Sequence, residues 1–277
     1  MGRCGASRHA VTRPPNVTRE TGDGARGRRL VDLPAPTGTS GGPDAAPVRL
    51  AVLIPCFNED TTVADVVAEF RGALPRADVY VFDNASCDRT VSQATRAGAQ
   101  VVHEPRRGKG HVLQSMFQTV DADVYVLVDG DGTYPAAAVR SLIEPIVRGR
   151  ADMVIGSRLH PAAVSEFDVV NRWGNRLFVL LSRVLFRISV TDLLSGYRAF
   201  TRAVVQHVRL TSGGFQVDAE FTIKTIRGRF RVIEVPVNLR RRPPGSHSKI
   251  RRFRDGLAIV QAMLTLRRLD HQGRDSE

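Results

Sequence analysis

Residues 124–135 read Val-Tyr-Val-Leu-Val-Asp-Gly-Asp-Gly-Thr-Tyr-Pro. The first five residues form an apolar run, which is typical of a buried β-strand. Asp129 and Asp131 follow at its carboxyl end, on a turn that Gly130 frees. Two carboxylates one residue apart can hold a divalent cation, which would stabilise a diphosphate as a leaving group. Because Asp-x-Asp also arises by chance, the surrounding sequence decides its meaning.

The flanking sequence alternates between strands and helices. We expect strands at 49–55, 79–82, 100–103, 124–128 and 152–155, and helices at 61–71, 88–97, 109–120 and 136–147. Apolar strands separated by helices of this length predict an α/β fold with a mostly parallel sheet flanked by helices. Farther along, the pattern predicts helices at 171–188, 216–226 and 253–269 and a strand at 231–239.

Polar side chains follow four of the expected strands. They are Asn58 and Glu59 after the first, Asp83 after the second, Asp129 and Asp131 after the fourth, and Arg158 after the fifth. Ligands of such sheets bind beyond the carboxyl ends of the strands. The sequence therefore predicts a nucleotide-type site at this edge of the sheet.

Local roles compete with ligand binding at these positions. Asn58 could cap a helix, with Glu59 in its first turn. Asp83 is a ligand candidate because a carboxylate can accept hydrogen bonds from a base N–H or a ribose hydroxyl. Residues 106–110, Arg-Arg-Gly-Lys-Gly, place Lys109 at a helix N-terminus that favours a phosphate or a base carbonyl. A solvated basic turn is the alternative for that segment.

Five motifs occur in order between residues 49 and 158: Pro55-x-x-Asn58-Glu59, Asp83-x-x-Ser86-x-Asp88-x-Thr90, Gly108-Lys109-Gly110, Asp129-x-Asp131 and Gly156-Ser157-Arg158. In order and spacing they resemble family 2 glycosyltransferases of the GT-A fold. The later segments 192–200 and 240–249 resemble the branch that contains dolichyl-phosphate mannose synthase and polyprenyl-phosphate glucose synthase.

The resemblance implies a Rossmann-like GT-A sheet followed by C-terminal amphipathic helices. It also implies a metal-dependent, inverting transfer of a sugar from a nucleotide sugar, of the GDP-mannose or UDP-glucose type, to dolichyl or undecaprenyl phosphate. Mg²⁺ or Mn²⁺ would be the cofactor. We expect a disordered basic extension at 1–47, the GT-A domain at 48–240, and a basic loop with an amphipathic, membrane-associating helix at 241–277.

The resemblance also assigns roles to single residues. Asp129, Asp131 and Arg158 would be catalytic, and the two aspartates would hold the metal. The nucleotide sugar would contact Pro55, Asn58, Glu59, Asp83, Lys109, Asp129, Gly130, Asp131, Arg240 and Lys249. The acceptor phosphate would meet Arg158, Arg172 and Arg176.

Two positions depart from the mannose synthases. Thr133 stands where those enzymes place a glutamine as a further metal contact, and Arg176 stands where they carry a serine. The first departure bears on which metal and which sugar are used. The second adds positive charge near the expected acceptor phosphate.

A lipid phosphate acceptor would simplify the chemistry. Its oxygen is already anionic at neutral pH, so no protein base need activate it. Metal and arginines would then stabilise the leaving diphosphate electrostatically, in a direct inverting displacement. Asp218 and Glu220 could orient the sugar, or serve as a base for a hydroxyl acceptor, or simply begin a helix.

The expected helix at 171–188 carries arginines beside an apolar face. Arg172, Arg176, Arg183 and Arg187 fall on one stripe at helical spacing. With a net charge of +12, this pattern suits either a helix lying on an anionic membrane or an ordinary amphipathic helix packed on the core. The sequence contains no stretch of about 18 uncharged apolar residues, so we expect no membrane-spanning segment.

We therefore expect a peripheral protein on the cytoplasmic face of the membrane. Its partners would be a nucleotide sugar and a polyprenyl phosphate, with a separate membrane protein as a further candidate. A related transferase with a soluble acceptor is the first alternative. A non-catalytic module that binds anionic lipid or nucleic acid is the second, and it leaves the strand-end carboxylates unexplained, because they would repel phosphate backbones.

Overall fold

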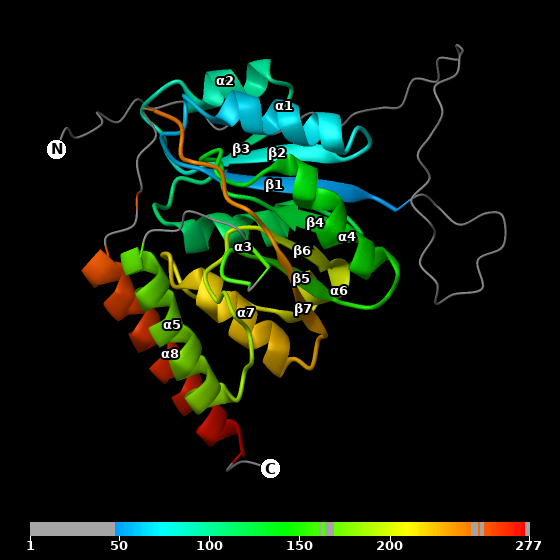
Figure 1. The fold of residues 1–277 in the computed structure, drawn as a ribbon. Helices are drawn as coiled ribbons and strands as arrows, with labels where there is room; N and C mark the ends of the chain where they lie inside the picture. Colours follow the sequence, from blue (N-terminus) through cyan, green and yellow to red (C-terminus); the bar gives the residue numbers. More distant parts are fainter. Residues whose placement is uncertain (1–47, 161, 164–168, 245–248, 250–251, 275–277) are drawn as a thin grey trace. The chain divides into compact units, whose positions relative to one another are not determined.

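The computed structural model describes residues 48–160, 162–163, 169–244, 249 and 252–274 (Figure 1). The extension expected to be disordered, residues 1–47, lies outside the described residues, as does the side chain of Arg172. None of the described helices is long and apolar enough to cross a membrane.

Seven strands form one mixed sheet in the order β3-β2-β1-β4-β6-β5-β7. Their bounds are β1 Leu50–Cys56, β2 Asp78–Asp83, β3 Gln100–His103, β4 Val124–Leu127, β5 Met153–Ser157, β6 Arg198–Thr201 and β7 Val232–Pro236. All pairings are parallel except those of β6, which runs antiparallel to β4 and to β5. The expected mostly parallel α/β sheet is confirmed.

Helices cover both faces of this sheet (Figure 1). Their bounds are α1 Val63–Ala73, α2 Thr90–Arg96, α3 Lys109–Thr119, α4 Val139–Val147, α5 Val169–Phe186, α6 Arg202–His207, α7 Val217–Arg227 and α8 Arg252–Arg274, with a 3₁₀ turn, η1, at Ala136–Ala138. Alternation along β1 divides the core, because successive strand side chains point to opposite faces. Val52 and Ile54 face α1 and α4, whereas Ala51 and Leu53 face α3, α6 and α7.

A third apolar core joins α5, α7 and α8. Phe178 of α5, Ile223 of α7 and Met263 of α8 are all buried in it. The helices α5 and α8 lie side by side at the lower left of Figure 1 and contact each other. Part of the apolar face of α5 thus packs inward, as the ordinary amphipathic interpretation expects.

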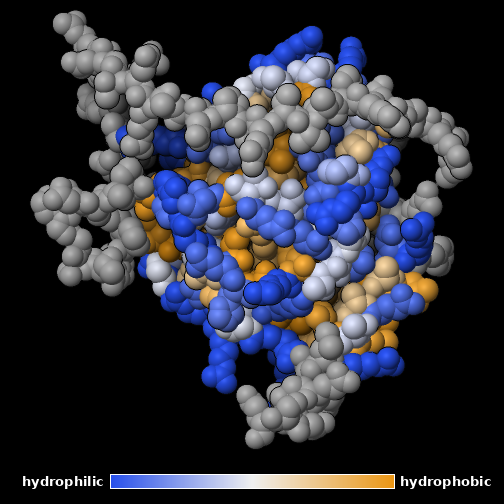
Figure 2. All heavy atoms as spheres, turned by 180° about the vertical axis from the view of Figure 1, so that it is seen from behind, coloured by the Kyte–Doolittle hydropathy of each residue, from blue (hydrophilic) through white to orange (hydrophobic). Residues whose placement is uncertain are grey.

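Other apolar side chains of the same two helices face solvent. Leu177, Leu180 and Val184 of α5 are more than half exposed, and Leu257 and Leu264 of α8 are also exposed. Figure 2, which shows the molecule from behind, has apolar atoms beside hydrophilic ones at the lower right, where these helices lie. Within the described residues, the packed core therefore leaves these apolar side chains of α5 and α8 exposed.

The sequence pattern around residues 198–207 predicts neither β6 nor α6. The strand β6 has only four residues and begins with Arg198, which is fully buried. A short strand with a charged first residue shows neither an apolar run nor an alternating pattern. Its place between β4 and β5 follows from long-range pairing alone.

Candidate active site

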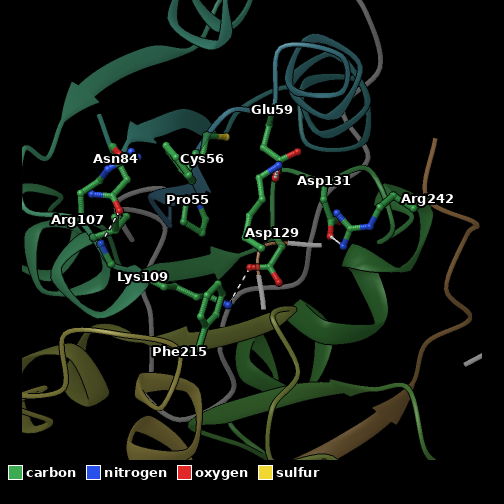
Figure 3. A pocket seen from close by; sticks show the side chains of 15 residues that line it. Pro55, Cys56, Glu59, Asn84, Arg107, Lys109, Asp129, Asp131, Phe215 and Arg242 are labelled. Atoms are coloured by element: carbon green, nitrogen blue, oxygen red, sulfur yellow. Dashed lines mark hydrogen bonds and ion pairs between the residues drawn. The ribbon is translucent and has the colours of Figure 1, made fainter. Parts of the chain in front are cut away.

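A cavity of about 310 Å³ opens at the carboxyl ends of β1 and β4 (Figure 3). Seven of the ten residues expected to contact the nucleotide sugar line it: Pro55, Glu59, Lys109, Asp129, Gly130, Asp131 and Lys249. The other three, Asn58, Asp83 and Arg240, do not. The cavity is also lined by Asn84, Arg107, Phe215 and Arg242, which the sequence analysis did not assign.

Two glycines allow the Asp129–Asp131 turn to sit tightly against its neighbours. A Cβ at Gly130 would lie 2.5 Å from the Cys56 Sγ, closer than real Cβ contacts come. A Cβ at Gly196 would lie 1.9 Å from Asp129 Oδ2. The backbone N–H of Gly196 donates instead to the hydroxyl of Tyr134 at 3.0 Å. The position of the Asp129 carboxylate is therefore fixed by close packing on the Gly196 backbone.

Lys109 joins two carboxylates at the floor of the cavity. Its Nζ lies 2.8 Å from Asp129 Oδ1 and 2.9 Å from Asp218 Oδ2, and its side chain is only 9% exposed. Burial alone would lower the pKa of Lys109, but the two carboxylates raise it above its ordinary value. Burial raises the pKa of Asp129, and the Lys109 ammonium opposes that rise. Lys109 is thus a fixed cation beside the expected metal site.

Glycines also determine how α3 presents Lys109. Gly108 has a φ of 129° and its missing Cβ would lie 2.1 Å from the carbonyl oxygen of Gly213. The N–H of Gly110 donates to that same carbonyl at 3.0 Å. This close approach docks the start of α3 on the loop that carries Phe215 into the cavity.

Asp131 is held by neighbours on both sides. Its Oδ1 accepts hydrogen bonds from the Thr133 backbone N–H at 3.0 Å and from the Thr133 hydroxyl at 2.6 Å. Its Oδ2 lies 2.5 Å from Arg242 Nη2. Thr133, which stands where the mannose synthases have a glutamine, therefore orients Asp131.

The donor set suits a hard divalent cation. In the part of the chain that the structure describes, no three His, Cys, Asp or Glu side chains are grouped to hold a metal. Mg²⁺ commonly uses one or two protein carboxylates together with substrate phosphates and water. Asp129 and Asp131 fit that arrangement, because both line the cavity in which a diphosphate would supply the other oxygens.

Asn58 and Asp83 serve the loops around the cavity. The side-chain oxygen of Asn58 accepts from the Cys87 N–H at 2.8 Å, and α1 begins only at Val63, so Asn58 is not its cap. Asp83 accepts from the Ser86 N–H at 3.2 Å. The Asn58 side chain thus connects the loop after β1 to the loop after β2, and the Asp83 side chain braces the turn that follows it.

Asn84, the residue after Asp83, lies in the cavity wall. Its amide donates to the carbonyls of Glu104 and Arg106, and its oxygen accepts from the Gly108 N–H at 2.7 Å. Asn84 thus fixes the basic turn that precedes α3. The guanidinium of Arg107 in that turn stacks over the Phe57 ring at 3.8 Å, which gives the cavity a flat wall.

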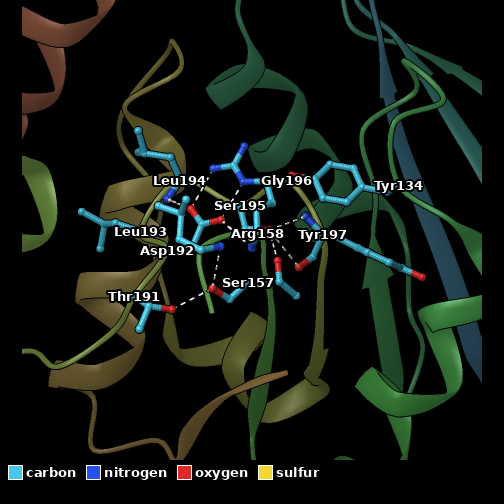
Figure 4. Close-up of polar contacts among 12 residues, drawn as sticks. Tyr134, Ser157, Arg158, Thr191, Asp192, Leu193, Leu194, Ser195, Gly196 and Tyr197 are labelled. Carbon is cyan, nitrogen blue, oxygen red and sulfur yellow. Dashed lines mark hydrogen bonds and ion pairs between the residues drawn. The ribbon is translucent and has the colours of Figure 1, made fainter. Parts of the chain in front are cut away.

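Arg158 belongs to a separate polar cluster beside the cavity (Figure 4). Its Nε and Nη2 lie 2.6 and 2.7 Å from the two oxygens of Asp192. Burial would raise the pKa of Asp192, but Arg158 holds it below its ordinary value. Of the other two expected acceptor residues, Arg176 is exposed on α5. Arg158 is not among the described residues that line the cavity.

Arg198 is a buried cation that organises this cluster. Its guanidinium donates to the carbonyls of Ser195, Leu193 and Asp218 and to the hydroxyl of Thr222. It therefore ties the turn beside Asp129 to the helix that carries Asp218. Arg198 lies in the segment 192–200 that carries part of the resemblance, but the sequence pattern does not predict that its side chain is buried.

The two acids at the start of α7 differ in role. Glu220 accepts hydrogen bonds from the backbone N–H groups of Thr211 and Ser212 and from Lys224, which fixes the loop before the helix. Glu220 is buried and is not among the residues that line the cavity, so in this structure it fixes a loop. Asp218 pairs with Lys109, and its Oδ1 has no hydrogen-bond partner among the described atoms.

Arg240 points away from the cavity, toward α1. Its Nη1 lies 2.5 Å from Glu69 Oε1, and its backbone N–H donates to the Thr133 carbonyl at 2.9 Å. Arg242, two residues later, reaches Asp131 instead. Lys249 lines the cavity, with its Nζ 3.3 Å from Glu59 Oε1.

Comparison with known proteins identifies relatives. The family model described as "Glycosyl transferase family 2" matches residues 51–209. Glycosyltransferase AglJ of Haloferax volcanii is 35% identical over 76% of this chain and 69% of its own. Undecaprenyl-phosphate mannosyltransferase of Micrococcus luteus is 30% identical over 72% of this chain and 86% of its own.

Solved structures share the fold. Glucosyl-3-phosphoglycerate synthase from Mycobacterium tuberculosis, in a complex with Mn²⁺, UDP-glucose and phosphoglyceric acid, aligns with a TM-score of 0.65. The alignment covers 79% of each chain at 22% identity, so it shows a common fold.

Proposed function

The chain belongs to glycosyl transferase family 2, and we propose that it moves a sugar from a nucleotide sugar to a polyprenyl phosphate at a membrane surface. The observation that carries the proposal is the meeting of Asp129, Asp131 and Lys109 in one cavity at the strand ends. The acceptor class is supported by the mannosyltransferase relative, whose name states undecaprenyl phosphate.

The donor half of the reaction falls to residues of β1, β4 and α3. Asp129 and Asp131 would hold Mg²⁺ or Mn²⁺, which when bound supplies charge stabilisation to the departing diphosphate. Lys109 adds a fixed positive charge, and Phe57 with Arg107 offers a flat wall for the base. Lys109 lowers the barrier by electrostatic preorganisation, because Asp129 and Asp218 set its position before the donor arrives.

The acceptor half needs no protein base. A phosphate monoester oxygen is anionic at neutral pH, so it can attack the anomeric carbon directly and invert its configuration. We propose Arg158, Arg172 and Arg176 as the cations that attract the lipid phosphate. Arg158 is held rigidly by Asp192, which fixes the direction of its guanidinium.

The exposed apolar side chains of α5 and α8 support contact with a membrane. Leu177, Leu180 and Val184 lie on the same helix as the exposed Arg176 and Arg183, and the exposed Arg187 directly follows that helix. Apolar residues beside arginines suit the boundary between acyl chains and anionic headgroups. Since α5 also carries Arg172, such contact would bring the acceptor phosphate close to the proposed cations.

A donor–acceptor panel tests the proposal. The purified chain is offered UDP-glucose and GDP-mannose with undecaprenyl phosphate in vesicles, with Mn²⁺, with Mg²⁺ or with chelator. We expect a lipid-linked sugar in one metal-containing arm, and its loss both in chelator and in Asp131→Asn. Lipid-linked sugar formed at full rate in chelator, or none formed in any arm, would overturn the proposal. Glycosylation of a soluble phosphate alone would favour the related transferase with a soluble acceptor.

A further inference from the structure

The acidic residues of the cavity are each matched with a cation of the chain itself (Figure 3). The three pairs are Asp129 with Lys109, Asp131 with Arg242, and Glu59 with Lys249. Carboxylates gathered in one cavity repel each other, and such pairing reduces that repulsion. The three cations therefore balance the negative charge of the cavity.

Of the three cations, Arg242 is the one that would compete with a metal for Asp131. Asp131 is only 13% exposed, its Oδ1 is engaged by Thr133, and its Oδ2 faces Arg242 Nη2 at 2.5 Å. The bond from the Arg240 N–H to the Thr133 carbonyl anchors the backbone two residues earlier. The anchor keeps Arg242 near Asp131, and the Arg242 side chain is 30% exposed, so it lies at the edge of the cavity and not in its closed interior.

From this arrangement we infer that Arg242 is an exchangeable counterion: it neutralises Asp131 until a metal and the donor diphosphate bind, and then turns to the diphosphate. The inference rests on the proposed function, because it needs a metal and a diphosphate as ligands. A divalent cation on Asp131 repels the guanidinium, and the diphosphate oxygens in the same cavity accept it.

The exchange predicts that the metal and the diphosphate strengthen each other's binding. A metal alone must compete with Arg242 for Asp131 and gains nothing from the displaced guanidinium. A metal that arrives with a diphosphate gives the guanidinium a new anionic partner. The two ligands therefore favour each other's binding, and by linkage the effect is reciprocal. Removing Arg242 should weaken this coupling from both sides.

The test measures two affinities that should move in opposite directions. In Arg242→Met, affinity for Mn²⁺ alone, measured by the electron paramagnetic resonance signal of free Mn²⁺, should rise about three- to tenfold, as loss of a competing ion pair implies. Affinity for UDP and affinity for GDP are measured by calorimetry at saturating Mn²⁺. For the nucleotide that the wild type binds, the affinity of the variant should be about tenfold lower. Arg242→Gln repeats both measurements with a polar side chain, and circular dichroism checks that each variant is folded.

Arg240→Met is the matched control, because Arg240 pairs with Glu69 outside the cavity. It should change neither affinity by more than about twofold. Unchanged or weaker Mn²⁺ binding in both Arg242 variants would overturn the inference, since Arg242 would then not compete for Asp131. If wild type binds neither UDP nor GDP, the proposed function fails, and the Mn²⁺ measurement still decides whether Arg242 occupies the metal position.

Discussion

Gly196→Ala should reduce turnover sharply without unfolding the chain. The added Cβ would lie 1.9 Å from Asp129 Oδ2, whereas real Cβ atoms essentially never approach within 3.0 Å. The Asp129 carboxylate must therefore retreat by about 1.1 Å or more. A displacement of about 1 Å in a catalytic group can cost about 10²-fold in rate. We expect a loss of this size in kcat/KM.

The assay compares initial rates of lipid-linked sugar formation with thermal unfolding followed by circular dichroism. Overpacking of this kind costs about 1–3 kcal/mol, which corresponds to a melting-temperature decrease of several degrees. The variant would thus remain folded at assay temperature. Gly72→Ala is the control, because a Cβ at Gly72 meets nothing within 4 Å. A Gly196→Ala enzyme within about twofold of wild type would refute the claim that packing on Gly196 positions Asp129.

Three further predictions address the surroundings of the site. Burial would raise the pKa of Glu220, but its hydrogen bonds outweigh burial and hold that pKa below its ordinary 4.5. The ionised Glu220 therefore stabilises the fold above pH 4.5, and this stabilisation is lost as the pH falls through the lowered pKa. Glu220→Gln should accordingly flatten the decline of the melting temperature between about pH 6 and 3. Changing Leu177, Leu180 and Val184 together to glutamine should weaken co-sedimentation with anionic vesicles about tenfold or more and leave nucleotide binding unchanged; equal co-sedimentation would exclude this stripe as the contact. Arg198→Met should lower the free energy of unfolding in urea by about 3 kcal/mol or more, because it leaves buried carbonyls without donors; a loss under about 1 kcal/mol would contradict that account.

The first half of the fold could be predicted closely because local pattern and tertiary structure agree there. The strand expected at 100–103 coincides with β3, and the helix expected at 109–120 differs from α3 by one residue. Strand ends in a parallel sheet share an edge, so Asp129 and Lys109 could be placed in one site from the sequence.

The parts that the sequence did not predict depend on single-residue offsets and long-range contacts. Asp83 and Asn84 are adjacent at a strand end, and only the loop geometry decides that Asn84 faces the cavity. Arg240 and Arg242 are equally basic neighbours of one loop, and Glu69 on α1 decides which of them turns away. The helix bearing Arg176 was expected, but which apolar residues pack inward depends on α8, far along the chain.

The reversed strand β6 shapes how the chain must fold as it is synthesised. Val124 of β4 pairs with Thr201, and β5 also reaches the sheet only through β6. Until the ribosome has released residues 198–201, the edge of β4 that pairs with β6 has no partner strand; this strand leads into the Asp129–Asp131 turn. Unpaired edges of this kind are where nascent chains associate wrongly. The four residues of β6 therefore close the edge of β4 that is exposed while the chain is being synthesised.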